Sequence, residues 1–370
     1  MSDRIYVGTH KGLFTIDRNA SGWQLSSNVS FLGDPVMQVL PNASGERVCA
    51  ALDLGHFGAK VHRSLDAGAT WEECATPEYP PKPEDADDAD MFGKPLEWKL
   101  SKIWALASGG ADRPDVIWCG TLPGGLFRSD DAGSSWTLNR PLWDNPLRKG
   151  WFGGGAELPG IHSICLDPRN SGHLSVGVSC GGVWVTENDG ASWDLRATGM
   201  RAAYMPPEQA GEPNIQDPHR VVQCQAAPEV LWAQHHNGIF RTTDGCASWY
   251  EITEAGPSTF GFAVAVHPND PNTAWFVPGV KDEKRIPVDG KLVVTRTRDG
   301  GRSFDVLTKG LPQQPAYDLV FRHGMDVDES GDRLAFGSTT GNLWVSEDQG
   351  DSWHCVSTNL PPINDVRFVK

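Results

Sequence analysis

The residues best suited to moving protons are a few histidines and carboxylates beside apparent strand ends and long loops. His162, Asp318 and Glu157 are predicted to be catalytic, because an imidazole and two carboxyls can act as general acids and bases. The histidines predicted to bind the substrate beside them are His10, His235 and His236. The spacing of these histidines matches no metal-binding motif, so we predict no metal. The glycine run at 153–155 lacks the spacing of a nucleotide-binding loop, and no other cofactor is predicted.

Aromatic side chains in the same regions are suited to holding a sugar. Flat rings offer a large apolar surface on which a sugar ring can stack. Trp151 and Phe262 are predicted to bind substrate in this way, and Trp98 and Trp104 are further candidates for stacking.

An eight-residue motif, Ser/Thr-x-Asp-x-Gly-x-Ser/Thr-Trp, recurs along the chain and must help to position these groups. Asn188 takes the Asp position in the third copy, and Cys246 takes the Gly position in the fourth. The Asp is predicted to accept hydrogen bonds from turn amides, and the Gly to allow a positive φ. Each copy therefore predicts a hairpin corner. The clear copies begin at Ser64, Ser129, Thr186, Thr242, Thr297 and Ser346, and a worn copy begins at Thr15.

This motif resembles the Asp-box of the BNR-repeat β-propellers, a superfamily that includes sialidases and sortilin-type receptors. The resemblance covers nearly the whole chain and implies an all-β fold, a single seven-bladed β-propeller domain over residues 1–370. Residues 363–368 look like a spare inner strand, and the N-terminus lacks one. We therefore expect residues 363–368 to pair beside residues 5–7 and close the ring, which removes free sheet edges.

In this superfamily the Asp-boxes lie on the face away from the ligand. The resemblance therefore places the ligand site on the opposite face, where we expect the long loops at residues 75–101, 138–160, 197–220 and 278–291.

The tripeptide Arg285-Ile286-Pro287 resembles the Arg-Ile-Pro motif of sialidases, which makes Arg285 a predicted substrate-binding residue. Sialidase chemistry needs three arginines on a carboxylate and a Tyr nucleophile paired with Glu. Here the motif falls in a late blade, whereas the family carries it in the first, and the chain has only 5 tyrosines. We therefore predict that the chain is not a standard sialidase.

Seven segments read as inner strands, at residues 36–41, 103–108, 161–168, 221–228, 261–268, 317–324 and 363–368. One column of a strand shares one environment, because side chains alternate between faces. The second column mixes aromatic with ionisable residues, which predicts a central pocket near the upper strand ends. The alternative is a water-filled channel whose polar groups satisfy each other. This column reads Met37, Trp104, His162, Val222, Phe262, Asp318 and Asn364.

The composition excludes some classes of binding partner. With 32 Lys and Arg against 47 Asp and Glu, the net charge of −15 would repel a phosphate backbone, so we predict no nucleic-acid partner. No apolar run reaches membrane-spanning length, so we predict no membrane association. The N-terminus does not read as a signal peptide, and the 8 cysteines include no CxxC pair. We therefore expect reduced thiols in a cytoplasmic protein.

Two classes of function remain open from the sequence. The first is a carbohydrate-active hydrolase or lyase that acts on a saccharide or another polar small molecule at the central pocket. Ionisable residues that converge on the inner strands favour it. The second is a non-catalytic propeller that binds a ligand or a protein partner, which the absence of a recognised catalytic pattern favours. The fold alone does not decide between them.

Overall fold

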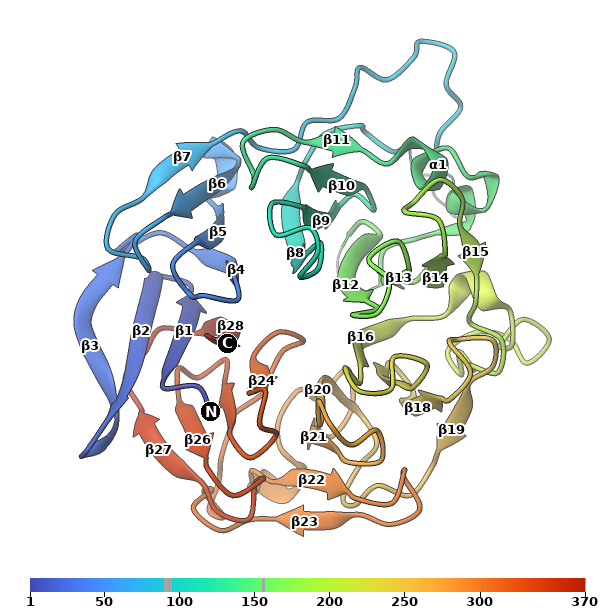
Figure 1. Ribbon diagram of the computed structural model, residues 1–370. Coiled ribbons are helices and arrows are strands. Elements are labelled where there is room, and N and C mark those ends of the chain that lie inside the picture. The colour runs from blue at the N-terminus through green and yellow to red at the C-terminus, as the bar shows by residue number, and fades with distance from the viewer. Residues whose placement is uncertain (90–92, 94, 155–156, 370) are drawn as a thin grey trace.

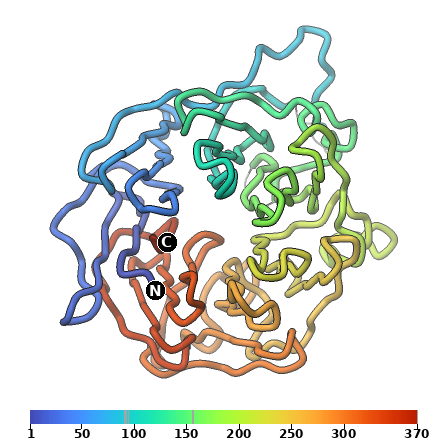
Figure 2. Tube along the Cα trace, in the orientation of Figure 1, coloured from blue at the N-terminus to red at the C-terminus, as the bar shows by residue number. Residues whose placement is uncertain are grey.

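Seven four-stranded antiparallel sheets form a ring of blades in this computed structural model (Figure 1). The structure describes residues 1–89, 93, 95–154 and 157–369. The predicted seven-bladed β-propeller is confirmed. The inner strands surround the centre of the ring, and both termini lie near that centre (Figure 2).

Each blade is named by its strands, which run from the centre of the ring outwards. The first blade consists of β28 (Ile363–Phe368), β1 (Arg4–Thr9), β2 (Gly12–Asn19) and β3 (Gly22–Ser30). The other blades are built from β4 (Val36–Pro41), β5 (Val48–Asp53), β6 (Ala59–Ser64) and β7 (Glu72–Cys74); β8 (Lys102–Ser108), β9 (Ile117–Leu122), β10 (Leu126–Ser129) and β11 (Thr137–Leu138); β12 (Gly160–Leu166), β13 (Leu174–Ser179), β14 (Gly182–Thr186) and β15 (Asp194–Leu195); β16 (Pro218–Gln223), β17 (Leu231–His235), β18 (Gly238–Thr242) and β19 (Tyr250–Ile252); β20 (Gly261–Val266), β21 (Ala274–Pro278), β22 (Val294–Thr297) and β23 (Asp305–Leu307); and β24 (Met325–Val327), β25 (Leu334–Gly337), β26 (Leu343–Ser346) and β27 (His354–Ser357).

The helical segments are short connections between strands. Among the described residues, no helix is both long and apolar enough to cross a membrane. These segments are α1 (Arg140–Trp143) and the 3-10 turns η1 (Gly55–Phe57), η2 (Pro146–Gly150), η3 (Pro213–Ile215) and η4 (Val288–Gly290).

The two ends of the chain close the ring as predicted. β28 pairs antiparallel with β1, so that Ile5 faces Phe368 and Val7 faces Val366. All four side chains are buried in one hydrophobic cluster. The last strand of the chain thus supplies the inner strand of the first blade, and β1 is paired on both sides.

The repeated motif forms the predicted hairpin corners. In the copy that begins at Ser129, the Asp131 carboxylate accepts hydrogen bonds from the Ser135 backbone N–H (2.8 Å) and from the Ser135 hydroxyl (2.6 Å). These bonds hold the pKa of Asp131 below its usual value. Gly133 has φ 89°, which a side chain would disfavour. The acid of the motif is therefore used within its own turn.

The worn copy at the N-terminus differs from the clear ones. Asn19 pairs with Gly22 in a plain hairpin between β2 and β3. Asp17 forms an ion pair with Arg4 at 2.7 Å and belongs to the ladder of β2. The worn copy therefore lies at the predicted hairpin, but its turn differs from that of the clear copies.

The motif turns and the starts of the inner strands lie at opposite ends of a blade. In the blade β12–β15, Leu166 at the end of β12 pairs with Leu174, which pairs in turn with Thr186, the first residue of a motif turn. His162 lies four residues earlier on β12, roughly 13 Å away along the strand. We call the two faces of the ring the motif face and the upper face.

Candidate functional site

A β-bulge recurs near the upper end of the inner strands. In β12, Ile161 and Ser163 pair with the consecutive residues Val178 and Gly177, so His162 stands outside the ladder. A bulge releases a residue from the pleat and redirects its side chain. The bulges leave the following residues outside the ladder: Met37, Trp104, His162, His219, Phe262 together with Ala263, and Asn364.

This set corrects the predicted column in two blades. β16 begins at Pro218, three residues before the predicted start, so His219 takes the place assigned to Val222, which pairs in the ladder with Trp232. β24 begins only at Met325, so Asp318 is not on an inner strand. The predicted strand over 317–324 is an irregular segment.

The segment before β24 brings Arg322 to the centre of the ring. The Arg322 guanidinium carbon lies 4.7 Å from the centroid of the Trp104 ring and 5.3 Å from that of Phe262. These aromatic residues belong to β8 and β20, which lie on opposite sides of the centre in Figure 1. Arg322 therefore sits close to the axis, between two flat rings that can stack on a cation.

Two donor atoms of Arg322 have no acceptor among the described residues. The residue is only 8% exposed, and its Nε and Nη2 atoms are buried without a hydrogen-bond acceptor from any described residue. Burial lowers its pKa to about 10, so the guanidinium is still charged at neutral pH. A buried charged donor without a partner is costly, and an anionic ligand would remove that cost.

A buried carboxylate and two imidazoles lie beside this arginine. Asp217, at the start of β16, is 2% exposed. Its Oδ1 accepts hydrogen bonds from the Ser179 hydroxyl (3.2 Å) and the Cys180 backbone N–H (3.3 Å). Its Oδ2 lies 3.6 Å from His219 Nε2 and 3.5 Å from His236 Nδ1.

The surroundings shift the pKa values of Asp217, His219 and His236 in different ways. Burial opposes a charge on Asp217, but contacts with His219 and His236 and the charge of Arg322 hold its pKa well below the usual range. The same carboxylate raises the pKa of His236, whereas burial lowers the pKa of His219. The cluster thus combines an ionised carboxylate with one imidazole that is easily protonated, an arrangement suited to proton transfer.

The cluster reaches solvent on one side. The side chains of His236 and Arg285 are 25% and 38% exposed. The Arg285 guanidinium carbon lies 5.2 Å from the centroid of the Phe262 ring, and its Nη2 donates to Asp282 at 2.6 Å. Phe262 is buried and stacks on His219, with ring centroids 4.3 Å apart. Of the predicted substrate-binding residues, His236, Phe262 and Arg285 therefore come together.

Two other predicted histidines lie beneath this cluster. His162 is fully buried, its ring is 5.5 Å from that of Trp104, and its carbonyl oxygen accepts a hydrogen bond from His323 Nε2 at 2.8 Å. His235 is also fully buried, and its Nε2 accepts a hydrogen bond from the Asp217 backbone N–H at 3.1 Å. Burial lowers the pKa of His235 to about 3. The His235 imidazole is therefore neutral, and its hydrogen bond helps to position Asp217.

The remaining predicted residues lie elsewhere. Asp318 accepts hydrogen bonds from Ser338 (2.7 Å) and Asn342 (2.8 Å) in the β25–β26 hairpin of its own blade. Trp151 is 1% exposed in the core between two blades, against Trp184. Residues exposed at the surface are Glu157 and His10.

The sequence prediction missed Asp217 and Arg322 and recognised His219 only as a loop residue. A usable signal for His219 existed, because an inner strand that begins at Pro218 places it in the second column. Arg322 had no such signal, because it reaches the centre from an irregular segment.

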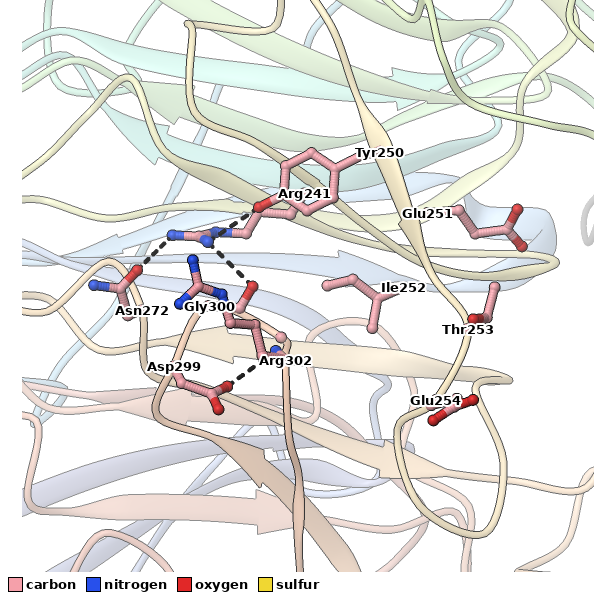
Figure 3. A pocket seen from close by; sticks show the side chains of 11 residues that line it. Arg241, Tyr250, Glu251, Ile252, Thr253, Glu254, Asn272, Asp299, Gly300 and Arg302 are labelled. Atoms are coloured by element: carbon pink, nitrogen blue, oxygen red, sulfur yellow. Dashed lines mark hydrogen bonds between the residues drawn. The ribbon is translucent and has the colours of Figure 1, made fainter.

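A concave site lies on the motif face, where a groove of about 770 Å³ is lined by β19 and by the motif turn that follows β22 (Figure 3). Its Arg241 donates to the Tyr250 hydroxyl (3.0 Å) and to Asn272 Oδ1 (2.8 Å). Hydrogen bonds within the protein therefore already use both terminal nitrogens of this arginine, although its Nε has no acceptor among the described residues.

Comparisons with known proteins show the fold alone. No protein-family model matches the chain, and no curated protein matches its sequence. Among solved structures, an ancestral GH74 enzyme is similar with a TM-score of 0.60 and 16% identity, covering 95% of this chain and 40% of that enzyme. The chain thus spans less than half of the enzyme's length.

Two further structures are YCF48 proteins. YCF48 bound to D1 peptide has a TM-score of 0.52 and 12% identity, over 86% of this chain and 80% of that one. YCF48 from Cyanidioschyzon merolae has a TM-score of 0.51 and 15% identity, over 88% and 87%. Together these likenesses support a seven-bladed β-propeller.

Proposed function

We propose that this protein is a carbohydrate-active propeller that acts on an anionic saccharide at the upper centre of the ring. The observation that carries the proposal is Arg322, a buried cation between two aromatic rings whose Nε and Nη2 meet no acceptor from the described residues. An arginine fork matches the geometry of a carboxylate or phosphate, and such charge-assisted bonds are among the strongest that proteins make.

The neighbouring residues suit the rest of such a ligand. Trp104 and Phe262 flank the guanidinium and offer flat surfaces to a sugar ring. Arg285 lies over Phe262 on the solvent side and adds a second positive charge. The acid group of the ligand would bind Arg322, and its sugar ring would extend towards Arg285 and His236.

Proton transfer falls to Asp217 and His236 in this proposal. The carboxylate lies 3.5 Å from His236 Nδ1 and keeps that imidazole easily protonated. His236 would donate a proton to a leaving oxygen or remove one next to the acid group, as hydrolysis or elimination requires. His162, behind Trp104, would help to shape the floor of the site.

A non-catalytic binding propeller is the second candidate. The burial of Asp217, which is 2% exposed, favours this alternative because it limits the reach of the carboxylate to a substrate. The fold neighbours include both an enzyme and a peptide complex, so they agree with either candidate.

Calorimetric titration with three ligand types tests the proposal. We expect oligogalacturonate and a sugar phosphate to bind and a neutral xyloglucan oligosaccharide not to bind. Comparing the affinities of the two acidic ligands shows whether the site prefers a carboxylate or a phosphate. Equal binding of the neutral ligand would overturn the proposal. Incubation with the ligand that binds, followed by assays for new reducing ends and for unsaturated products, then distinguishes an enzyme from a binding protein.

A further inference from the structure

We propose that Asp217, His219 and His236 form a site for one first-row divalent metal ion of the Zn²⁺ type. The three side chains each offer one ligand atom, and these atoms all lie within 4.8 Å of one another. The site would lie next to Arg322 and would use the Asp217–His236 pair to which the proposed function assigns proton transfer, so a bound ion would take the place of the proton between them. Its test stands apart from that function, because metal binding requires no saccharide.

The distances fit a metal better than they fit hydrogen bonds. Asp217 Oδ2 is 3.6 Å from His219 Nε2 and 3.5 Å from His236 Nδ1. Good N–H···O hydrogen bonds are shorter, roughly 2.7–3.2 Å. In a tetrahedral zinc site with bonds of about 2.0–2.1 Å, neighbouring ligand atoms lie roughly 3.3–3.4 Å apart. The two distances to Asp217 are already close to this spacing, and the distance between the two imidazole ligand atoms is at most 4.8 Å.

The groups behind the ligand atoms already hold them in the required state. His219 Nδ1 lies 2.7 Å from the Gly261 carbonyl oxygen, which can only accept, so Nδ1 carries the proton and Nε2 presents its lone pair. Bonds from Ser179 and Cys180 occupy Asp217 Oδ1 and leave Oδ2 for the ion. Such supporting hydrogen bonds are typical of metal-binding histidines and carboxylates.

The backbone ties the three residues into one unit. Asp217 and His219 flank Pro218 at the start of β16, and His236 follows β17 in the same blade. The His236 backbone N–H donates to the Asp217 carbonyl oxygen at 2.9 Å. Pairing between the adjacent strands β16 and β17 thus brings the three residues together without a short sequence motif.

The donor set indicates the class of metal. Two imidazoles and one carboxylate suit zinc and its first-row neighbours, whereas magnesium and calcium prefer oxygen ligands. Three protein ligands leave a fourth position open, as in zinc sites that bind a substrate or a water molecule. His236 is 25% exposed, so this position can be reached from solvent.

Titration of the full-length protein with metal ions alone tests the site. After dialysis against a chelator, we expect calorimetry to show one Zn²⁺ per chain, and Co²⁺ to give visible absorption bands of a site with low coordination number. Mg²⁺ should not bind measurably. Failure of both Zn²⁺ and Co²⁺ to bind the wild-type protein would overturn the proposal.

Matched variants locate the ion. His236→Ala and Asp217→Asn should each weaken Co²⁺ binding by more than about 10-fold, because each removes a ligand. His354→Ala is the control, since this histidine is exposed on the outer strand β27. Binding that is unchanged in His236→Ala would place the ion on other histidines and overturn the assignment. His236 is half-buried, and a thermal melt of its variant verifies the fold.

Discussion

Two arginines of this propeller are equally buried and yet differ in what their donors meet. Arg241 and Arg322 are each 8% exposed, and each lies against an aromatic ring, Arg241 on Trp232 at 4.9 Å and Arg322 on Trp104 at 4.7 Å. Arg241, on the motif face, also donates to the carbonyl oxygens of Pro271 (3.2 Å) and Gly300 (3.1 Å). The Nε atoms of both arginines meet no acceptor within the described ranges, but at the centre of the ring Nη2 of Arg322 also lacks one.

The difference separates structural charge from functional charge. A guanidinium that binds its own protein stabilises the fold, and its removal leaves carbonyl oxygens without partners. A guanidinium whose buried donors are unused costs stability and is available to a ligand. Two equally buried arginines can therefore have different roles, one in stability and one in ligand binding, depending on which acceptors lie nearby.

The largest expected effect is on ligand affinity. Arg322→Met should weaken binding of an acidic saccharide by more than about 100-fold, because it removes charge-assisted hydrogen bonds worth roughly 1.5–3 kcal/mol each. Arg241→Met is the matched control and should leave affinity unchanged. Calorimetry with the acidic ligand makes the comparison, and equal losses in both variants would erase the proposed distinction.

The same two variants should behave in the reverse order in unfolding experiments. Arg241→Met removes several hydrogen bonds and should lower the free energy of unfolding by about 3 kcal/mol. Arg322→Met should leave it unchanged or raise it, since methionine removes a buried guanidinium whose Nε and Nη2 have no hydrogen-bond acceptor among the described residues. Urea titrations measure both values, and a large destabilisation by Arg322→Met would mean that this arginine holds the centre together.

A pH series extends the comparison to carboxyls. Burial raises the pKa of Asp365, on the inner strand β28, to about 6 despite the nearby charges of Arg367 and Arg220. A carboxyl with a raised pKa stabilises the fold fully below its unfolded pKa, and this contribution is lost as the pH rises through about 6. Between pH 4 and 7, the wild-type protein should therefore lose up to about 3 kcal/mol relative to Asp365→Asn.

Urea unfolding of both proteins at several pH values measures this difference. Asp326 also faces this carboxyl and opposes its ionisation. A difference that does not change with pH would show that Asp365 is ionised throughout and that Arg367, whose Nε lies 3.1 Å from its Oδ1, outweighs burial.

The smallest effect is expected at a motif turn. Asp131→Ala should lower the free energy of unfolding by about 1–2 kcal/mol, because the Ser135 backbone N–H loses its acceptor. Asp130→Ala is the neighbouring control, since the Asp130 side chain is 67% exposed and pairs only at the surface with Arg128. Ligand affinity should stay the same in both variants. A loss of affinity in Asp131→Ala would connect the motif face to the site.

The number of blades and the ring closure could be predicted because they depend on local patterns. Each motif turn is stabilised within a few residues, as between Asp131 and Ser135, and so repeats visibly in the sequence. The pairing of residues 363–368 with residues 5–7 followed from counting strands, since one end had a spare strand and the other lacked one.

The centre could be predicted only in part. His236, Phe262 and Arg285 were predicted to bind substrate and do lie together around His219, whereas Asp318 is hydrogen-bonded to a hairpin of its own blade. The start of β16 was placed three residues too late, which hid Asp217 and His219. β-bulges caused further ambiguity, because they redirect single side chains without a clear change in the alternating pattern.

Only the tertiary structure decided which arginine has two buried donors without an acceptor among the described residues. Arg322 meets Trp104 and Phe262 from two other blades, across more than 200 residues of chain in one case and 60 in the other. No spacing in the sequence encodes such a contact, because closure of the ring sets the distances between blades. The sequence determined the hairpins and their number through short-range hydrogen bonds. The site arises where inner strands of several blades and the segment before β24 meet, and where burial leaves two donors of Arg322 without an acceptor among the described residues.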